Sequence, residues 1–373
     1  MKTFKKIMIV TAVVIAILAV SLMLFMQLPV FGKHTTGEDL ARIEKSTNYK
    51  DGSFQNVQPT EVMLKEVSTL RVMREMLNKP STVEPSKPLP TVKTDLKNLA
   101  SDKLTIVWFG HSSYLIKYKD FTVLVDPVMS GYASPIGIFG KAFEGTDVFS
   151  VDDLPLIDLL VITHDHYDHL DYATLIKLHT SVKNIITPLG VDAHLKHWGV
   201  PAEKIKSLDW WETHKLNDST IITSTPSRHF SGRGFTRGKT LWSSFVLNLQ
   251  GHNIFIGGDS GYDNQFKKIG DLYGPFEIAM LETGQYGKNW PFIHMMPEEV
   301  ANAAQDLQAN VLLPVHWAKF ALSNHAWTEP IERLIASGEG KVVMTTPKIG
   351  EPVRLGDTLP VEKWWREVDV LIR

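Results

Sequence analysis

Short apolar runs alternate with polar segments along most of the chain, but one much longer apolar run stands near its start. The run Ile7 to Met26 is almost entirely Ile, Val, Ala, Leu and Met, carries no charge, and follows Lys2, Lys5 and Lys6. A helix of about 20 apolar residues spans the hydrocarbon core of a bilayer. Basic residues before such a helix favour an N-terminus on the cytoplasmic side. The pattern predicts a single-pass membrane anchor in residues 1–28, with the rest of the chain extracytoplasmic.

A cleaved signal peptide is the alternative for this segment. The apolar core of a signal peptide is usually about 7–15 residues long, which is shorter than this run. Val30, Phe31 and Gly32 also make a poor cleavage site. The run is apolar all round rather than amphipathic, which argues against a buried helix of a soluble protein. An uncleaved anchor is therefore favoured.

Residues 29–100 are expected to form a connector between the anchor and a folded domain. Apolar residues recur at helical spacing and predict a helix from Thr60 to Leu77. Its methionine-rich stripe is expected to pack in the core, with contact to lipid as the alternative: Met63, Leu64, Val67, Leu70, Val72, Met73 and Met76. Four prolines between residues 80 and 90 then predict a stiff linker.

Residues 101–373 show the mixture of strand and helix patterns typical of an α/β domain. Three β-type runs, at 104–109, 113–117 and 122–125, predict an opening meander. Helices are expected at 171–178, with Asp171 as N-cap, and at 297–307, with Pro297 in the first turn.

The densest cluster of reactive side chains follows an apolar run at 159–163. His164, Asp165, His166, Asp168 and His169 fall within six residues, where a buried strand would end. Neutral imidazole is the commonest protein ligand for metals such as zinc. His164 and His166 alternate and can face one ion, whereas Asp168 and His169 come after the turn and can reach a second ion.

Three further strand-like runs each deliver one more metal-binding side chain. The runs at 221–226, 253–258 and 311–315 are followed by His229, Asp259 and His316. Buried strands that end at a shared edge would bring these side chains to the cluster. A carboxylate such as Asp259 can bridge two cations about 3.5–4 Å apart, so the pattern predicts a binuclear site.

The motif His-x-His-x-Asp-His with these three later ligands resembles the metallo-β-lactamase superfamily. The resemblance implies a four-layer αβ/βα sandwich and two zinc ions, although manganese or iron are also compatible with such ligands. It implies that His164, His166 and His229 hold the first ion, that Asp168, His169 and His316 hold the second, and that Asp259 bridges them.

Motifs between the ligands narrow the resemblance to the branch of N-acyl-phosphatidylethanolamine-hydrolysing phospholipase D. They are Trp108 to Ser113, Leu124 to Pro127, Ala133 to Pro135, Gly258 to Tyr262, His294 to Glu299 and His316 to Leu322. The likeness covers roughly residues 95–373. It implies a phosphodiesterase that acts on a lipid or another envelope phosphodiester.

Composition agrees with a folded enzyme and removes several alternatives. Apolar residues make up 43% of the 373 positions, and 39 basic against 41 acidic residues leave a net charge of −2. This balance argues against nucleic acid as the partner. The chain has no cysteine, which excludes disulfides, a thioether lipid anchor and thiolate ligands.

Other polar residues near the motifs are candidates for roles beyond metal binding. We expect Asp165 to orient the nucleophile or accept its proton, and the branch resemblance places His294 beside the substrate or leaving group. His111 would line the floor of the site or support a ligand, and Tyr167 would donate a hydrogen bond or pack. One of Arg228, Arg233 and Arg237 would pair with a substrate phosphate.

Three functions remain open from the sequence. The first is a membrane-anchored phosphodiesterase. The second is a hydrolase of a lactone, an amide or a β-lactam, although Asp259 stands where many true β-lactamases carry cysteine. The third is a non-catalytic binding module, which the complete set of ligands argues against.

Overall fold

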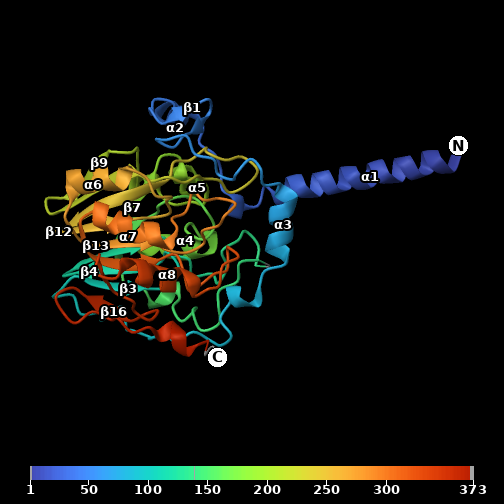
Figure 1. Cartoon of the computed structure of the whole chain (residues 1–373). Coiled ribbons are helices and arrows are strands. Elements are labelled where there is room, and N and C mark those ends of the chain that lie inside the picture. Colours follow the sequence, from blue (N-terminus) through green and yellow to red (C-terminus); the bar gives the residue numbers. More distant parts are fainter. Residues whose placement is uncertain (1, 138, 370–373) are drawn as a thin grey trace.

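The protein is described from a computed structural model, which covers residues 2–137 and 139–369. Two seven-stranded sheets pack face to face, with helices on the outer face of each sheet (Figure 1). This arrangement is the four-layer αβ/βα sandwich that the sequence predicts.

The first sheet has the order β16-β3-β4-β5-β6-β7-β8. Its pairs are antiparallel from β16 to β5 and parallel from β5 to β8. The bounds are β3 Thr105–Trp108, β4 Tyr114–Tyr118, β5 Phe121–Val125, β6 Ile157–Val161, β7 Val182–Pro188, β8 Ile205–Leu208 and β16 Pro352–Arg354.

The second sheet has the order β15-β14-β13-β12-β11-β10-β9 and the same division. Its pairs are antiparallel from β9 to β12 and parallel from β12 to β15. The bounds are β9 Thr213–Asn217, β10 Thr220–Pro226, β11 Ser243–Leu249, β12 His252–Ile256, β13 Phe276–Glu282, β14 Ala309–Val315 and β15 Val343–Met344.

Three apolar cores hold the layers together. The central core lies between the sheets and includes Ile106, Val123, Phe245 and Ile254. The outer face of the first sheet is covered by α4 (Tyr172–Leu178) and α5 (Val191–His197), and that of the second by α6 (Gln265–Tyr273), α7 (Pro297–Asp306) and α8 (Glu329–Gly338). The parallel strands are buried on both faces, which explains their nearly unbroken apolar runs.

Helix starts follow the signals in the sequence. The side chain of Asp171 accepts a hydrogen bond from the backbone N–H of Ala173 at 3.1 Å and caps α4 as expected. Pro297 stands at the first position of α7, where its missing N–H costs nothing.

The segment predicted as a connector packs closely on the domain. It contains α2 (Gly37–Ile43) and the hairpin of β1 (Tyr49–Lys50) and β2 (Ser53–Phe54). Ile43 and Phe54 join Trp210 and Trp242 in a small core of their own, and Leu89 and Leu96 are buried in the larger cores.

The helix predicted over residues 60–77 is wrong in its first half. Only α3, Thr69–Leu77, forms. The backbone N–H of Leu64 donates to the carbonyl oxygen of Asn289 at 2.9 Å, so a contact with the domain replaces a helical bond. Ser68 then caps α3 by accepting from the N–H of Arg71. The expected core packing of the methionine stripe is also wrong, because Leu70, Met73 and Leu77 are exposed.

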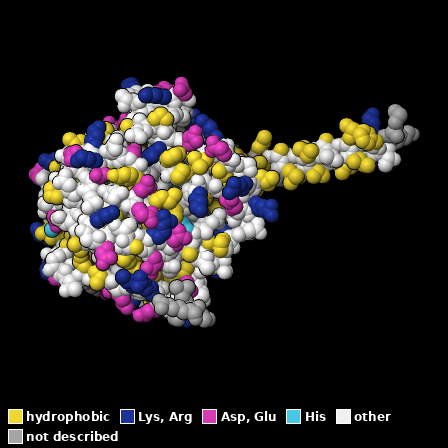
Figure 2. Space-filling model, in the orientation of Figure 1, with side chains coloured by type: hydrophobic (Ala, Val, Ile, Leu, Met, Phe, Trp, Pro, Cys, Tyr) yellow, Lys and Arg dark blue, Asp and Glu magenta, His cyan; other side chains and the backbone are white. Residues whose placement is uncertain are grey.

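The apolar N-terminal run forms α1, Lys2–Phe25. The helix projects from the domain as a straight rod (Figure 1), and apolar side chains cover it (Figure 2). Within the described residues it is the one helix long and apolar enough to cross a membrane, and none of that stretch is buried. A short 3₁₀ turn, Pro29–Phe31, follows it.

Candidate metal centre

Seven side chains converge where strands of both sheets end. Strand β6 is followed by His164, β10 by His229, β12 by Asp259 and β14 by His316. All four are at most 3% exposed. The shared strand edge expected from the sequence is therefore present.

The first group of ligands consists of His164, His166 and His229. Nδ1 of His166 lies 2.9 Å from Nε2 of His164 and 3.2 Å from Nε2 of His229. Ligand nitrogens about 2.0–2.1 Å from a tetrahedral zinc ion would stand about 3.3 Å apart. The three nitrogens are thus spaced as ligands of one ion.

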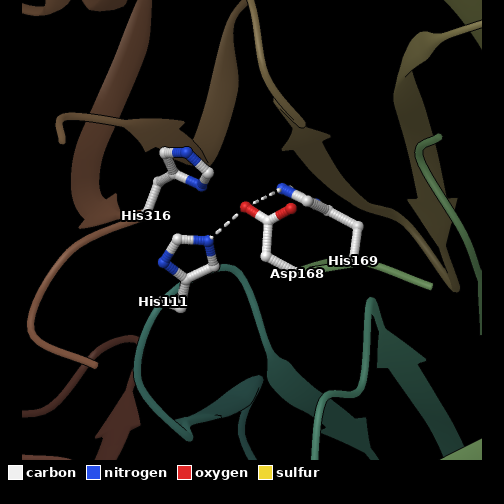
Figure 3. Close-up of side chains that lie close together, drawn as sticks. All are labelled: His111, Asp168, His169 and His316. Atoms are coloured by element: carbon white, nitrogen blue, oxygen red, sulfur yellow. Dashed lines mark hydrogen bonds and ion pairs between the residues drawn. The ribbon is translucent and has the colours of Figure 1, made fainter. Parts of the chain in front are cut away.

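The second group consists of Asp168, His169 and His316, with His111 beside them (Figure 3). Oδ2 of Asp168 lies 3.6 Å from Nε2 of His169 and 2.9 Å from Nε2 of His111. His111, whose role the sequence leaves open, is fully buried at the floor of the site. Its N–H donates to Asp168 and fixes the direction of that carboxylate.

Asp259 reaches both groups. Its Oδ2 lies 3.2 Å from Nε2 of His169, 3.6 Å from Nε2 of His164 and 3.7 Å from Nε2 of His229. Its Oδ1 lies 3.2 Å from Nδ1 of His316. One carboxylate thus stands between the ligands of two ions, as a bridging residue would.

The outer nitrogen of each histidine that would bind through Nε2 has a partner of its own. Nδ1 of His169 donates to Asp126 at 2.8 Å, and Nδ1 of His229 donates to the carbonyl oxygen of Ile293 at 2.8 Å. Thr163 and Ser112 contact Nδ1 of His164 and His316 at 3.0 and 2.9 Å. In His164, His169 and His229 these contacts leave Nε2 toward the centre, the arrangement typical of metal-binding histidines. In His316 it is Nδ1 that faces Asp259.

The same network explains the position of Asp126. Its carboxylate also accepts from the backbone N–H and the hydroxyl of Thr163, at 2.8 and 2.6 Å. Asp126 therefore bonds both to Thr163, at the start of the loop that carries ligands (residues 164–169, the metal loop), and to His169 within it.

Unpaired buried atoms indicate that the donors suit a metal. Nε2 of His169 and Oδ1 of Asp259 are buried and lack a hydrogen-bond partner within the described part of the chain. Buried polar atoms normally have partners, and a cation between these atoms would satisfy both. The residues present therefore fit a metal centre, with no sulfur ligand available.

Burial sets the protonation of the ligands. It lowers the pKa of His164, His229 and His316 well below the usual value, and the neighbouring histidines add to the effect. Burial also lowers the pKa of His166 to about 4, although nearby aspartates oppose it. These rings are neutral at pH 7, which is the form that binds metals.

Burial raises the pKa of Asp259 to about 6, although the charge of His169 opposes the rise. Burial would lower the pKa of His169, but Asp259, Asp168 and Asp126 together raise it well above its usual value. The three carboxylates around His169 therefore stabilise a positive charge at this position.

The role expected for Asp165 is not supported by its contacts. Its Oδ1 accepts from the N–H of Gly232 at 2.7 Å, and its Oδ2 accepts from Thr240 and His194 at 2.8 and 3.2 Å. Burial would raise its pKa, but the hydrogen bond and charge of His194 hold it well below the usual range. Both oxygens are occupied and weakly basic, so this carboxylate holds the loop in place instead of accepting a proton.

His294 lies at the wall of the centre as expected. Its ring centroid is 5.0 Å from that of His229 and 5.3 Å from that of His316. Its Nδ1 donates to Oε2 of Glu282 at 2.6 Å. Glu282 is fully buried and also accepts from the backbone N–H groups of Ser260 and Met295.

Sequence reasoning missed Glu282. It ends β13, the one parallel strand of the second sheet between those that deliver Asp259 and His316. The sequence signal for Glu282 is an apolar strand followed by a carboxylate, which is the same kind of signal that identified Asp259.

A cavity of about 330 Å³ opens above the ligands. Polar ligand atoms form its floor, and its walls are mostly apolar, with Val62, Met63, Met76, Phe230, Trp290, Ile293 and Leu322. Of the three candidate arginines, Arg237 lines this cavity. Arg228 instead bonds to Thr60 and the carbonyl oxygen of Tyr262, and Arg233 is buried beneath the loop.

Tyr167 connects the metal loop to the loop that carries Arg233. Its hydroxyl donates to the carbonyl oxygen of Arg233 at 2.5 Å, and its ring lies 4.1 Å from the guanidinium carbon of the same residue. Its role is to pack and to bond the two loops together.

Comparison with known proteins supports this description. A family model described as beta-lactamase superfamily domain matches residues 122–317. An uncharacterised protein of Mycobacterium tuberculosis is 37% identical over 340 residues, which cover 88% of this chain and 91% of that protein.

A relative with a described activity and a solved structure are also similar. N-acyl-phosphatidylethanolamine-hydrolysing phospholipase D 1 of Caenorhabditis elegans is 30% identical over 246 residues, covering 62% of this chain and 68% of that protein. The structure of Igni18, a metallo hydrolase of Ignicoccus hospitalis, aligns with a TM-score of 0.53 at 21% identity, covering 69% of this chain and all of that one. This structural likeness shows the shared fold.

Proposed function

The chain belongs to the metallo-β-lactamase superfamily of metal-dependent hydrolases, and we propose that it is a binuclear zinc phosphodiesterase that acts on membrane phospholipids. The observation that carries the proposal is the position of Asp259 between two groups of ligands at the floor of an apolar-walled cavity. The similarity to a phospholipase D that hydrolyses N-acyl-phosphatidylethanolamine supports the substrate class.

His164, His166 and His229 would hold one ion, Asp168, His169 and His316 would hold the other, and Asp259 would bridge them. Two such ions supply Lewis-acid stabilisation of a phosphoryl group and a water that ionises near pH 7. His164, His166, His229 and His316, which are neutral, would bind without first losing protons, whereas His169 would give up its charge to the ion. Thr163, Asp126 and Ser112 keep His164, His169 and His316 oriented.

The remaining side chains of the cavity would handle the substrate. Arg237 would bind a phosphate oxygen, since guanidinium recognises phosphate through paired hydrogen bonds. His294 in its charged form, with Nδ1–H bonded to Glu282, would give its Nε2 proton to the leaving group and return to the neutral ring, which burial favours by lowering its pKa. Met63 and Met76 would contact acyl chains, because flexible thioether side chains adapt to irregular apolar surfaces.

We further propose that α1 anchors the enzyme in the membrane with the domain outside the cytoplasm. The uncharged exposed length of α1 and the lysines before it support this placement. A retained anchor would keep the cavity near its lipid substrate.

Substrate panels test the proposal. Full-length protein purified in detergent and loaded with zinc is incubated with N-acyl-phosphatidylethanolamine, simple phosphodiesters, lactones and nitrocefin. We expect phosphatidic acid from the lipid and little turnover of the last two. Turnover of lactone or nitrocefin without phosphodiester cleavage would favour the other hydrolase class, and near-zero metal content would favour a non-catalytic module.

A further inference from the structure

Helix α3 turns large apolar side chains away from the domain, the reverse of a surface helix in a water-soluble domain. Arg71, Glu75 and Asn78 line an open cavity of about 700 Å³ at the edge of the domain, with the side chain of Arg71 65% exposed. Oε2 of Glu75 accepts from the side-chain amide of Asn289 at 2.8 Å. This polar contact attaches the helix to the domain.

The outward face of α3 carries three large apolar side chains, with one basic residue, Arg74, among them. Leu70, Met73 and Leu77 follow one another at spacings of three and four residues, so they form one stripe. Their exposed fractions are 76%, 56% and 78%. A surface helix normally turns its apolar stripe to the core and its charges to water. Contiguous exposed apolar surface marks a site of contact with a membrane or another protein.

The anchor leaves the domain at a fixed place beside the metal loop. The guanidinium of Arg233 donates twice to the carbonyl oxygen of Val30, at 3.0 and 2.8 Å, and Nε1 of Trp198 donates to that of Pro29 at 2.7 Å. The ring of Phe31 contacts Phe25 of α1 and Tyr167 of the metal loop, at centroid distances of 5.0 and 6.5 Å. The orientation of the domain relative to α1 is therefore set by buried contacts.

Both α3 and a second exposed apolar group lie close to this exit point. A Cβ atom added to Gly234 would come within 2.9 Å of the side-chain methyl of Met26, so this loop touches the end of α1. The next residue, Phe235, is 81% exposed. Met76 of α3 lines the metal cavity together with His166 and Asp168. Figure 1 shows α3 at the side of the domain from which α1 projects.

We propose that the apolar stripe of α3, together with Phe235, docks on the surface of the same phospholipid leaflet that holds the end of α1. The inference rests on the proposed anchoring of α1. A lipid surface is the occupant because the proposed anchor brings the domain to one. In addition, Met76 of α3 shares a cavity with Phe230 and Arg237, in the same loop whose Gly234 touches the end of α1. An amphipathic helix of this kind lies in the interface with its apolar face among the headgroups and upper acyl chains.

The docked position would place the mouth of the metal cavity against the membrane. Met63 and Met76 line the cavity together with the metal ligands, and Met76 belongs to the helix that carries the outer stripe. A phospholipid would then present its phosphate to the centre while its acyl chains stay on the apolar side of the cavity. The substrate class that fits this geometry is a membrane lipid with its reacting bond in the headgroup.

Single-cysteine labelling tests the docking, because the chain has no native cysteine. Leu70→Cys, Met73→Cys, Leu77→Cys and Phe235→Cys are each labelled with an environment-sensitive fluorophore in the full-length protein. The variants are reconstituted in phosphatidylcholine vesicles with some phosphatidylglycerol. Val14→Cys in α1 reports the anchor, and Leu272→Cys in α6, which is 59% exposed, is the matched control.

We expect labels at 70, 73, 77 and 235 to shift to the blue and to be quenched several-fold more by spin-labelled lipid than the label at 272. Quenching at 14 but not at 70, 73 and 77 would overturn the docking and leave the anchor intact. A water-exposed label at 14 would overturn the anchor, and the docking with it. Labels on α3 that remain water-exposed in lipid but become shielded on adding a protein partner would contradict a lipid occupant.

Discussion

At the scale of single residues, Asp259 is the side chain on which the proposed binuclear centre would depend. Its carboxylate lies within 3.7 Å of histidines from both ligand groups. Each of the other ligands belongs to one group. Loss of this carboxylate removes a ligand from both ions and leaves their charges facing one another.

We predict that Asp259→Ala loses at least one metal ion and nearly all turnover. The loss should exceed the roughly 10–100-fold typical of changes to residues that only support ligands. Metal content by elemental analysis and turnover on the same sample check this. Two ions per chain with ordinary activity would show that Asp259 is no bridge.

Asp165→Asn is the matched control. It removes a neighbouring buried carboxylate whose oxygens bond to Gly232, Thr240 and His194, so we expect both metals to remain and the thermal midpoint to fall. An unchanged thermal midpoint with loss of turnover would instead indicate that Asp165 accepts a proton during the reaction.

Glu282 holds His294 through Oε2, while its Oε1 accepts from the backbone N–H groups of Ser260 and Met295. We predict that Glu282→Gln lowers kcat about 10–100-fold, the range for a residue that orients a catalytic group, while metal content is unchanged. The pH profile of kcat should also shift, because the amide no longer stabilises a charged His294. An unchanged profile with a fall in folding stability alone would make Glu282 a purely structural residue.

At the scale of elements, the ends of strands could be read from the sequence better than the contacts between loops. All seven proposed ligands follow apolar runs that became β6, β10, β12 and β14. The partners of Asp165 lie in a loop 67 to 75 residues away in sequence. No periodicity encodes such a pairing, because it depends on how two loops meet after the sheets pack.

The error over residues 60–77 has a related cause. Helical spacing was present throughout, but the backbone of Leu64 bonds to Asn289 instead of to its own helix. The stripe on α3 was real, yet the sequence could not show which side it faces, since polar contacts to Asn289 decided that. Amphipathic spacing predicts a face and not its environment.

Arg233 joins three segments and should be important for stability. Besides Val30, its guanidinium donates to the carbonyl oxygens of Asp165 and Leu170 at 2.7 Å each. We predict that Arg233→Met lowers the free energy of unfolding by about 2–5 kcal/mol, because buried carbonyl oxygens lose their donors at about 1–3 kcal/mol each.

Urea unfolding of the variant in detergent measures this change. Arg354→Met is the control, because its ion pairs with Asp102 and Asp357 lie at the surface, where such pairs contribute little. Equal effects of the two substitutions would mean that the contact between the metal loop and the base of α1 does not stabilise the protein.

At the scale of the whole molecule, the anchor and the metal centre are parts of one rigid arrangement. The segment after α1 bonds to Trp198 at the end of α5 and to Arg233 beneath the ligand loop. If α1 anchors the protein as proposed, these bonds would hold the cavity at a constant position relative to the membrane. A flexible tether would instead let the domain sample many orientations.

The proposed orientation predicts the outcome of proteolysis on intact bacterial spheroplasts. We expect external protease to digest the catalytic domain without lysis, because the lysines before α1 favour an inside N-terminus. Protection until lysis would place the domain in the cytoplasm. A cleaved signal peptide would give a released chain smaller by roughly 3 kDa, the mass of one membrane span.

The central claim is that the metal centre hydrolyses a phosphodiester bond of a lipid. The most direct measurement is turnover of N-acyl-phosphatidylethanolamine by the zinc-loaded full-length enzyme in water enriched in heavy oxygen, with the Asp259→Ala variant alongside. The account predicts phosphatidic acid that carries the heavy oxygen on its phosphate, and loss of this product in the variant. Heavy oxygen in a released fatty acid without labelled phosphatidic acid, or no cleavage at all, would contradict it.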